Sequence, residues 1–388
     1  MRNPFGQTAS VISISLRGSF GRTGLTLSVM LCVALVVATL LSLDALRRGL
    51  TFALEQSGSS DIALIMRGGS QSEMNSALSG EQVDILLAAP GVDAISPEVN
   101  LIVDGIQRSD GARANIGLRG LTGVGVSMRP RVSLIDGRWP AVGASELAVG
   151  ADVARRYVGF ELGDTVRFGA AGWTIVGVFE AAGGVVASEI WADLTAVQNL
   201  FDRANTVQSV RAGLQKSGDI LELAAFVERD PRLQLAVQTE ASYYAAQAAR
   251  NSELVQNLAW PLAILLAVGA VVGALNIMLA SLAERRVEIA TFRAVGFSRR
   301  AICSGLVIEY LIICVVAGLL GALAAYLILD GAEATALSSG VTRIGYVLQF
   351  SPTGLLQGVI LSAAIGICGS LVPAVLAGRR RVTLDLTR

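Results

Sequence analysis

Four long apolar segments constrain what this 388-residue chain can fold into more than any other feature of its sequence. They run over residues 25–43, 258–282, 303–329 and 354–378. A helix needs about 20 apolar residues to cross the roughly 30 Å hydrocarbon core of a membrane, so each segment is long enough to span it. The sequence therefore predicts an α-helical membrane protein whose first two spans are separated by a long polar insertion.

The distribution of arginines predicts the orientation of these spans, because Lys and Arg accumulate on the cytoplasmic side. The loop between the second and third spans holds five arginines, and three more follow the fourth span, at Arg379, Arg380 and Arg381. The loop between the third and fourth spans holds only Arg343. We therefore expect both termini in the cytoplasm of a bacterial inner membrane and the insertion on the other side.

The insertion, residues 46–257, is large enough for a core of its own. Short β-branched and aromatic runs separated by glycines lie between Val99 and Val186, and helical patterns flank them at Gly80–Ala89 and Asp193–Phe201. This mixture predicts a mixed α/β domain, in one lobe or two. Its ends, Asp44–Gln56 and Glu240–Asn257, fit either helical stalks that continue the spans or ordinary linkers.

These expectations divide the chain into nine parts. The boundaries are 1–23 for a cytoplasmic N-terminal segment that is an amphipathic helix or a disordered tail, 24–45 for the first span, 46–257 for the external domain with its stalks, 258–283 for the second span, 284–302 for a cytoplasmic loop, 303–329 for the third span, 330–353 for an external loop, 354–378 for the fourth span and 379–388 for a cytoplasmic tail.

Composition excludes most catalytic chemistry from this chain. It has no histidine, which removes His-dependent zinc sites and nucleophile systems, and its single lysine, Lys216, follows Gln215 and so cannot complete a Walker A loop. Its cysteines lie in apolar segments, and its net charge of zero gives no footprint for nucleic acid. We expect no catalytic residue, no metal and no cofactor bound by this chain.

The loop after the second span is too patterned for a simple connector. Glu288, Ile289, Phe292 and Arg293 follow the spacing of one helix face with an apolar centre and a charged rim, and Gly296 fits a helix stop. We predict a surface helix that receives force from a partner, against the alternative of a solvated loop that obeys the arginine rule. The candidate contact residues are Glu284, Arg285, Arg286, Glu288, Ile289, Phe292, Arg293, Ala294, Val295 and Gly296.

Polar and small residues inside the spans form a second candidate set, for gating or packing. An ionised Glu309 at mid-membrane would cost about 2.5–3.5 kcal/mol, so it should face protein or water, either in a gating or pairing role or bonded to a neighbour such as Arg299 or Arg300. A GxxxG motif in the second span fits a dimer interface or packing within one subunit. The set is Gly269, Gly273, Asn276, Glu309, Gly318, Gly321 and Pro373.

The segment from Glu284 to Arg300 resembles the "ER-x-x-EIA-x-x-RAVG-x-S" motif of FtsX-type ABC transporter permeases, the group that includes MacB, LolC, LolE and DevC. Glu309 followed by two glycines, and Pro373-Ala374 followed by arginines, are similar to later motifs of that family. The external runs 136–140, 146–150, 162–166 and 176–178 resemble a MacB-like periplasmic core domain. Two departures are the missing proline near the C-terminus and the absence of a fused nucleotide-binding domain.

The resemblance implies a permease subunit whose coupling helix, residues 284–302, meets a separate cytoplasmic ABC ATPase that binds ATP and Mg. It further implies a second permease copy or homologue in the lipid bilayer and, for an export system, a periplasmic membrane-fusion adaptor and an outer-membrane channel. Motion would reach the periplasm by mechanotransmission. The alternatives are an FtsX-like signalling subunit that regulates a cell-wall hydrolase and a LolC/LolE-like subunit that releases lipoproteins.

Overall fold

The computed structural model describes residues 8, 11–13, 23–169, 171–181, 184–338 and 342–379, which fall into two compact units. The first unit comprises Met1–Arg48, Glu253–Ala332 and Leu348–Arg388, and the second Gly49–Ser252 and Glu333–Val347. Most of the predicted amphipathic N-terminal segment and the last arginines of the C-terminal tail lie outside the described residues. We describe each unit by itself.

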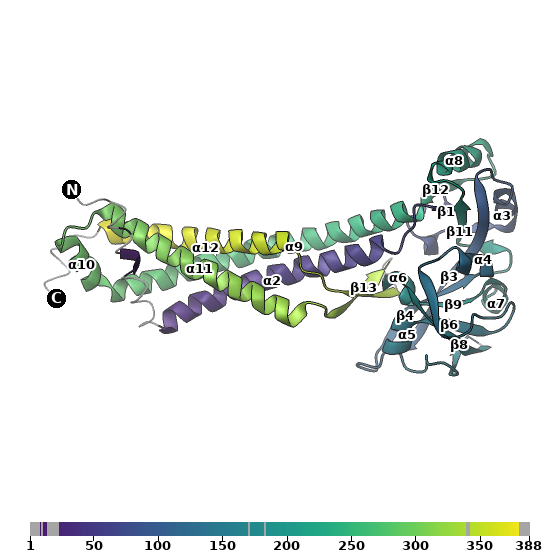
Figure 1. Ribbon diagram of the computed structural model, residues 1–388, viewed down its shortest axis with the longest axis horizontal. Coiled ribbons are helices and arrows are strands. Elements are labelled where there is room, and N and C mark those ends of the chain that lie inside the picture. The colour runs from purple at the N-terminus through teal and green to yellow at the C-terminus, as the bar shows by residue number, and fades with distance from the viewer. Residues whose placement is uncertain are drawn as a thin grey trace. The chain divides into compact units, whose positions relative to one another are not determined.

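Four helices of the described chain are long and apolar enough to cross a membrane (Figure 1). They are α2 (Thr23–Glu55), α9 (Glu240–Glu284), α11 (Arg299–Leu329) and α12 (Pro352–Arg379). A mixed α/β sheet domain lies in the sequence between the first and second of them, which confirms the predicted fold class. Both α2 and α9 extend beyond their apolar segments, so the two predicted stalk segments are helical.

The first unit is held together by close contacts of α11 with its neighbours. A Cβ added to Gly321 would lie 2.2 Å from the backbone oxygen of Ala34 on α2, and one added to Gly318 would lie 2.6 Å from Ser362 on α12. The core between these helices is formed by valine, leucine and other apolar side chains that include Val33, Val37 and Ala317. Glycine therefore allows the close approach of α11 to both helices, because a side chain at Gly321 would meet the backbone of α2 and one at Gly318 would meet the side chain of Ser362.

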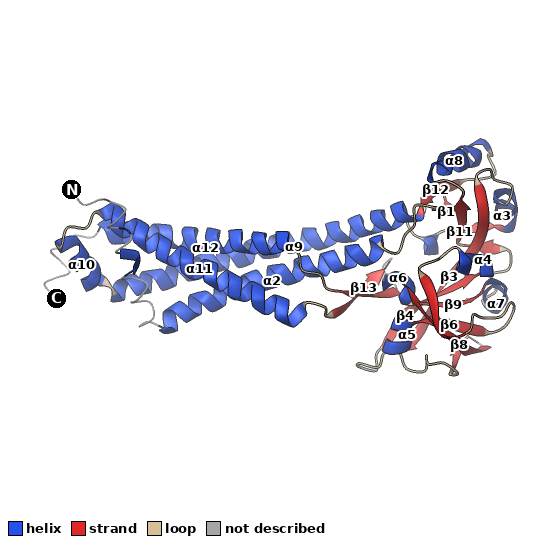
Figure 2. Ribbon diagram, viewed as in Figure 1, coloured by secondary structure: helices blue, strands red, loops and turns tan. Residues whose placement is uncertain are grey.

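The second unit is built on a ten-stranded mixed sheet with short helices along it (Figure 2). The strand order is β12-β1-β11-β3-β4-β9-β6-β8-β5, with β7 paired to β8. The bounds are β1 Ile62–Arg67, β3 Val92–Ile106, β4 Arg113–Leu121, β5 Val132–Gly137, β6 Glu146–Gly150, β7 Thr165–Phe168, β8 Ala171–Ala181, β9 Glu189–Asp193, β11 Ser209–Leu214 and β12 Leu235–Thr239. The long strand β3 pairs with β11 over its first half and with β4 over its second, so it joins two lobes of one sheet.

Short elements complete this unit, and their ends follow local sequence signals. Ser79 and Gln82 form a capping box at the start of α3, and the side chain of Asp193 caps α7. The remaining bounds are α3 Gly80–Leu86, α4 Gly123–Ser127, α5 Ala151–Arg156, α6 Gly184–Ala187, α7 Leu194–Leu200, α8 Ile220–Arg229, η1 Glu73–Asn75, η2 Ser217–Asp219 and the small pair β2 Leu78–Ser79 with β10 Thr206–Val207.

The segment between α11 and α12 differs from the predicted loop, because it contains a β-hairpin. Its strands are β13 (Glu333–Ser338) and β14 (Thr342–Val347), and it belongs to the second unit. Arg156 pairs with Glu333 at 3.0 Å, and the backbone N–H of Gly345 donates to Ser188 Oγ at 3.1 Å. Ile344 and Tyr346 are buried. The hairpin therefore attaches the chain between the last two spans to the sheet domain.

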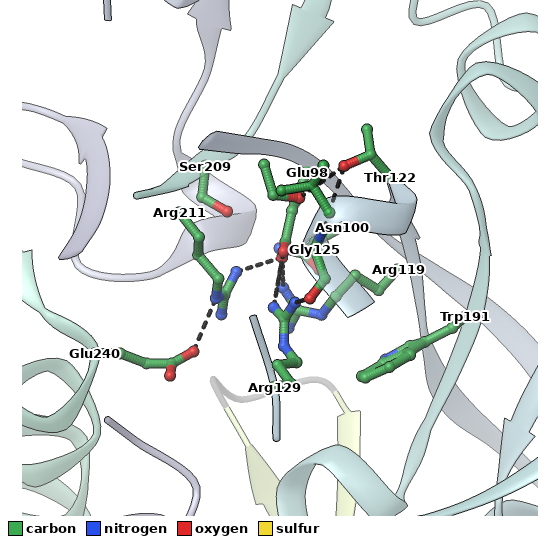
Figure 3. Close-up of polar contacts among 12 residues, drawn as sticks. Glu98, Asn100, Arg119, Thr122, Gly125, Arg129, Trp191, Ser209, Arg211 and Glu240 are labelled. Carbon is green, nitrogen blue, oxygen red and sulfur yellow. Dashed lines mark hydrogen bonds and ion pairs between the residues drawn. The ribbon is translucent and has the colours of Figure 1, made fainter. Parts of the chain in front are cut away.

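Glu98 on β3 lies at the centre of a buried ion-pair network (Figure 3). Its carboxylate accepts hydrogen bonds from Arg129 at 2.8 and 3.0 Å and from Arg119 at 2.8 Å, and it also pairs with Arg211. Arg211 is on β11 and Arg119 on β4, and β3 lies between those strands. One carboxylate therefore joins the two lobes of the sheet.

Two further carboxylates connect this network to the start of α9. Glu73 accepts a hydrogen bond from Arg119 and another from Arg211, both at 2.9 Å. Glu240, the first residue of α9, accepts one from Nε of Arg211 at 2.8 Å. Both carboxylates are buried, and Arg211 is 1% exposed. Arg211 therefore fixes the first turn of α9 against the sheet within the second unit.

Burial and pairing act in opposite directions on these charges. Desolvation would raise the pKa of Glu73, but attraction and hydrogen bonds from Arg119 and Arg211 outweigh it and hold that pKa far below its usual value. Burial likewise opposes ionisation of Glu98, whose pKa is nevertheless lowered by its arginines. Burial would lower the pKa of Arg211, but the neighbouring carboxylates raise it well above its usual value. All three groups stay charged at neutral pH.

Replacing Arg211 with methionine should strongly destabilise the sheet domain. The change removes the arginine that pairs with Glu240 and one of the arginines that pair with Glu73 and Glu98, and breaking a buried pair in this way costs about 3–5 kcal/mol. Hydrogen exchange of the full-length protein should show faster exchange of β3 and β11 amides. Arg232→Met is the matched control, because its pair with Asp230 is exposed and little change is expected. Equal protection in both variants would contradict the role of the network.

The sheet domain should also lose stability in acid. Glu73 and Glu98 have usual pKa values of 4.5 and lower values in the folded chain, so their contribution is fully present above about pH 4.5 and is lost as the pH falls toward the folded values. Near-ultraviolet circular dichroism of the three tryptophans in this unit should show a thermal midpoint that falls below this pH. The fall should be smaller in Arg211→Met, and an equal fall in both proteins would assign it to other groups.

Candidate functional site

The loop predicted to contact a partner forms a separate short helix, α10 (Arg286–Ala294), between α9 and α11. Gly296, two residues after the last residue of α10, terminates the helix: its φ of 98° lies in the left-handed region that favours glycine, and its N–H donates to the Arg293 oxygen at 3.1 Å. Ser298 then caps α11, because its Oγ accepts a hydrogen bond from the N–H of Ala301 at 3.2 Å. The end of α10 and the start of α11 are therefore both well defined, and only a few residues connect the two helices.

One face of α10 packs inward. Ile289 and Phe292 are half-buried against the core of the helical unit, and Ala290 is buried. The ring of Phe292 lies 5.5 Å from that of Phe297, measured between centroids. Ile289 and Phe292, the predicted apolar centre of one helix face, thus lie on the side that packs on the core, and their contact with a partner stays a prediction. α10 has apolar residues on two faces, and the face that carries Phe292 packs on the core.

The opposite face of α10 is exposed and partly apolar. Its members follow helical spacing, and the exposed fractions of Val287 and Val295 are 63% and 62%. Arg286 and Glu288, which are also exposed, flank this outward face on its two sides. The outward face consists of Val287, Thr291, Ala294 and Val295. Of the predicted contact residues, Glu284, Arg286, Glu288, Ala294, Val295 and Gly296 are exposed and Arg293 is half-buried.

A buried ion pair anchors α10 to α11. Nη1 of Arg285, the residue before α10, donates to Oε2 of Glu309 at 2.9 Å, and the residues are 3% and 1% exposed. Glu309 thus pairs with Arg285, whereas one sequence hypothesis named Arg299 or Arg300. Burial also removes Arg285 from the surface that a partner could touch. The two residues are 24 positions apart in the sequence, so no local pattern predicted that they would pair.

The remaining span residues separate into packed and exposed positions. Pro373 is buried in α12, and the next carbonyl oxygen, of Ala374, accepts a hydrogen bond from Cys303 Sγ at 3.1 Å. In contrast, a Cβ added to Gly269 or Gly273 would meet no atom of the described chain within 4 Å. Asn276 is exposed on the same helix. The GxxxG motif therefore does not pack within the described part of this subunit, and the interface alternative stays a prediction.

Within the described ranges, no three His, Cys, Asp or Glu side chains lie together so that they could hold a metal ion. Sequence reasoning missed the arginines and glutamates of the sheet network. Their signal was present only as charged residues at strand positions with apolar neighbours, such as Arg211 between Val210 and Ala212.

Comparisons with known proteins agree with both units. The family model described as the MacB-like periplasmic core domain matches residues 24–250, and the FtsX-like permease C-terminal model matches residues 261–381. The periplasmic region of MacB from Actinobacillus actinomycetemcomitans, a solved structure, aligns with a TM-score of 0.38 at 14% identity over 48% of this chain and 91% of that one.

Curated relatives are longer than this chain. It is 27% identical over 229 residues to a macrolide export ATP-binding/permease protein, MacB 1/2, of Paracoccus denitrificans, over 56% of this chain and 33% of the relative. It is 29% identical over 244 residues to MacB of Bdellovibrio bacteriovorus, over 58% and 36%. The chain thus spans about a third of the length of these relatives. Since the core-domain model matches more than half of it, the chain belongs to the MacB-like periplasmic core domain family and is an ABC-transporter permease of the FtsX/MacB type.

Proposed function

We propose that this multi-pass permease couples ATP hydrolysis by a separate cytoplasmic ATPase to movement of its periplasmic domain. The observation that carries the proposal is the outward face of α10, which exposes Val287 and Val295. The Arg285–Glu309 ion pair anchors the start of this short helix to α11. An amphipathic helix of this kind fits a groove on a partner. The ATPase would bind ATP and Mg, and α10, with both chain termini, would lie in the cytoplasm.

The anchoring of α10 supports a mechanical role. The Arg285–Glu309 pair ties the start of α10 to α11, and Phe292 packs on the same core, so a force on the outward face would move the long helices and not only a loop. α9 is continuous from Glu284 back to Glu240, where Arg211 holds its first turn. The β13–β14 hairpin offers a second covalent route from α11 and α12 to the sheet domain.

A second permease copy or homologue would complete the assembly. α9 has an exposed face of apolar residues at alternating steps of three and four residues, which is the pattern of a helix–helix seam. Its small and polar members would allow close approach and an interhelical hydrogen bond in lipid. The face consists of Leu258, Leu262, Leu265, Gly269, Val272 and Asn276. A periplasmic adaptor and an outer-membrane channel belong to the export form of the proposal; its cargo is unassigned.

Photo-crosslinking tests where the ATPase binds. A photoreactive residue placed at Val287 or Val295 of the full chain, in its native membranes, should crosslink to an ATP-binding protein with a Walker A motif. The same probe at Ile289 should not, because that side chain packs inward. Equal crosslinking from both faces, or crosslinking to lipid alone, would contradict the assignment.

A charge on the outward face should uncouple the partner. Val287→Asp places a carboxylate in the proposed contact and should weaken ATPase binding about tenfold or more, as loss of a central apolar contact does. Leu221→Asp is the matched control, since Leu221 is 77% exposed on α8 of the sheet domain. Both variants should insert and remain monodisperse. ATPase stimulation that is equal in the two would refute the face.

The Arg285–Glu309 pair should act by position rather than by charge. Glu309→Leu alone leaves a buried arginine and should lower the thermal midpoint and ATPase stimulation together. The double variant Arg285→Met, Glu309→Leu should restore both, because well-packed apolar replacements of buried pairs are often neutral. A double variant that is stable but uncoupled would instead show that the charges take part in gating.

A further inference from the structure

A cavity of about 410 Å³ opens among α2, α9 and α12 of the helical unit. Its walls are mainly apolar, with Leu41 from α2, Ala259 and Trp260 from α9 and Leu361 from α12. The volume lies within the roughly 300–1,000 Å³ of small-molecule sites. No motif from the sequence analysis points to this cavity, and the proposed coupling does not use it.

The cavity has a charged end, at the point where α2 leads on toward the sheet domain. Arg47 and Arg48 both line it and both pair with Asp44, at 2.9 and 2.7 Å. Two guanidinium groups and one carboxylate leave one net positive charge. The carboxylate of Asp44 holds the guanidinium of Arg48 in place, and Nη2 of Arg48 donates to Thr353 Oγ1 at 3.0 Å.

The start of α12 adds to this positive end. α12 begins at Pro352, and Gly354 in its first turn lines the cavity. A Cβ added to Gly354 would lie 2.8 Å from Oδ2 of Asp44, so the first turn lies directly against the charged group. The N-terminus of a long helix carries a partial positive charge that attracts anions. Trp260 is 66% exposed at the same cavity, as is usual for aromatic residues at the depth of lipid headgroups.

We propose that this cavity is a binding site for an anionic phospholipid. One acyl chain lies along the apolar walls, and the phosphate lies at Arg47 and Arg48 beside the start of α12. The paired charge and apolar surface fit an amphiphile, whereas neither a free anion nor a purely apolar molecule would use both. The net positive end favours an anionic headgroup over a zwitterionic one. The site makes the helical unit sensitive to the lipid composition of the membrane.

Trp260 allows a direct test, since the other three tryptophans lie in the sheet domain. The full chain is placed in nanodiscs of phosphatidylcholine that contain either brominated phosphatidylglycerol or brominated phosphatidylcholine as quencher. Brominated phosphatidylglycerol should quench Trp260 at a mole fraction about fivefold lower than brominated phosphatidylcholine requires. This is the factor that ~1 kcal/mol per net basic charge gives. Trp260→Phe should remove the lipid-dependent part of the quenching.

Two variants with opposite expected effects decide the proposal. Arg47→Gln with Arg48→Gln should abolish the preference, whereas Asp44→Asn should increase it by raising the net positive charge. Arg299→Gln with Arg300→Gln is the matched control, because it removes two exposed arginines outside the cavity and should leave the preference unchanged. Equal quenching by both lipids in the unmodified chain, or a preference that none of the cavity variants changes, would overturn the proposal. Either result would mean that the quenching comes from lipid that surrounds the helices and not from a lipid bound in the cavity. If the double arginine variant does not fold, Asp44→Asn alone decides the outcome.

Discussion

A buried charge must have a fixed partner, and this constraint organises both units of the chain. An ion removed from water loses several kcal/mol of hydration, which only a well-placed opposite charge returns. Glu98 meets this condition through three arginines, on β4, on β11 and in the turn that follows α4, so it draws these three parts of the chain together. Glu309 meets it through Arg285 and thereby sets where α10 begins. In both cases a polar requirement, and not apolar packing alone, decides which elements meet.

The outline of the fold could be predicted from the sequence because its signals are local. Apolar length alone identified the four long helices, and the helical patterns at Gly80–Ala89 and Asp193–Phe201 contain α3 and α7. The hairpin β13–β14 escaped prediction because its apolar residues Ile344 and Tyr346 are few and acquire a buried side only by packing on the second unit.

The candidate site was predictable in place but not in orientation. The charged segment of residues 284–302 contains the expected helix, yet Phe292 turns inward and Val287 outward, because the choice depends on the core that surrounds α10. Likewise Glu309 required a partner, but a residue 24 positions earlier cannot be selected from several nearby arginines without the path of the chain. Tertiary contacts supply this information, and one sequence does not.

The two ends of the inserted domain are neighbours at one edge of its sheet. β1, the first strand after α2, pairs antiparallel with β12, the last before α9, and the backbone N–H of Ala241 donates to the Ser59 oxygen at 3.0 Å. Adjacent strands lie about 4.8 Å apart, so the chain enters and leaves the domain at nearly one point. A domain attached in this way is a module. A fold whose termini form a similar pair could replace the inserted segment without changing the spacing of α2 and α9 along the chain, provided that it also accommodates the β13–β14 hairpin, which belongs to the same unit.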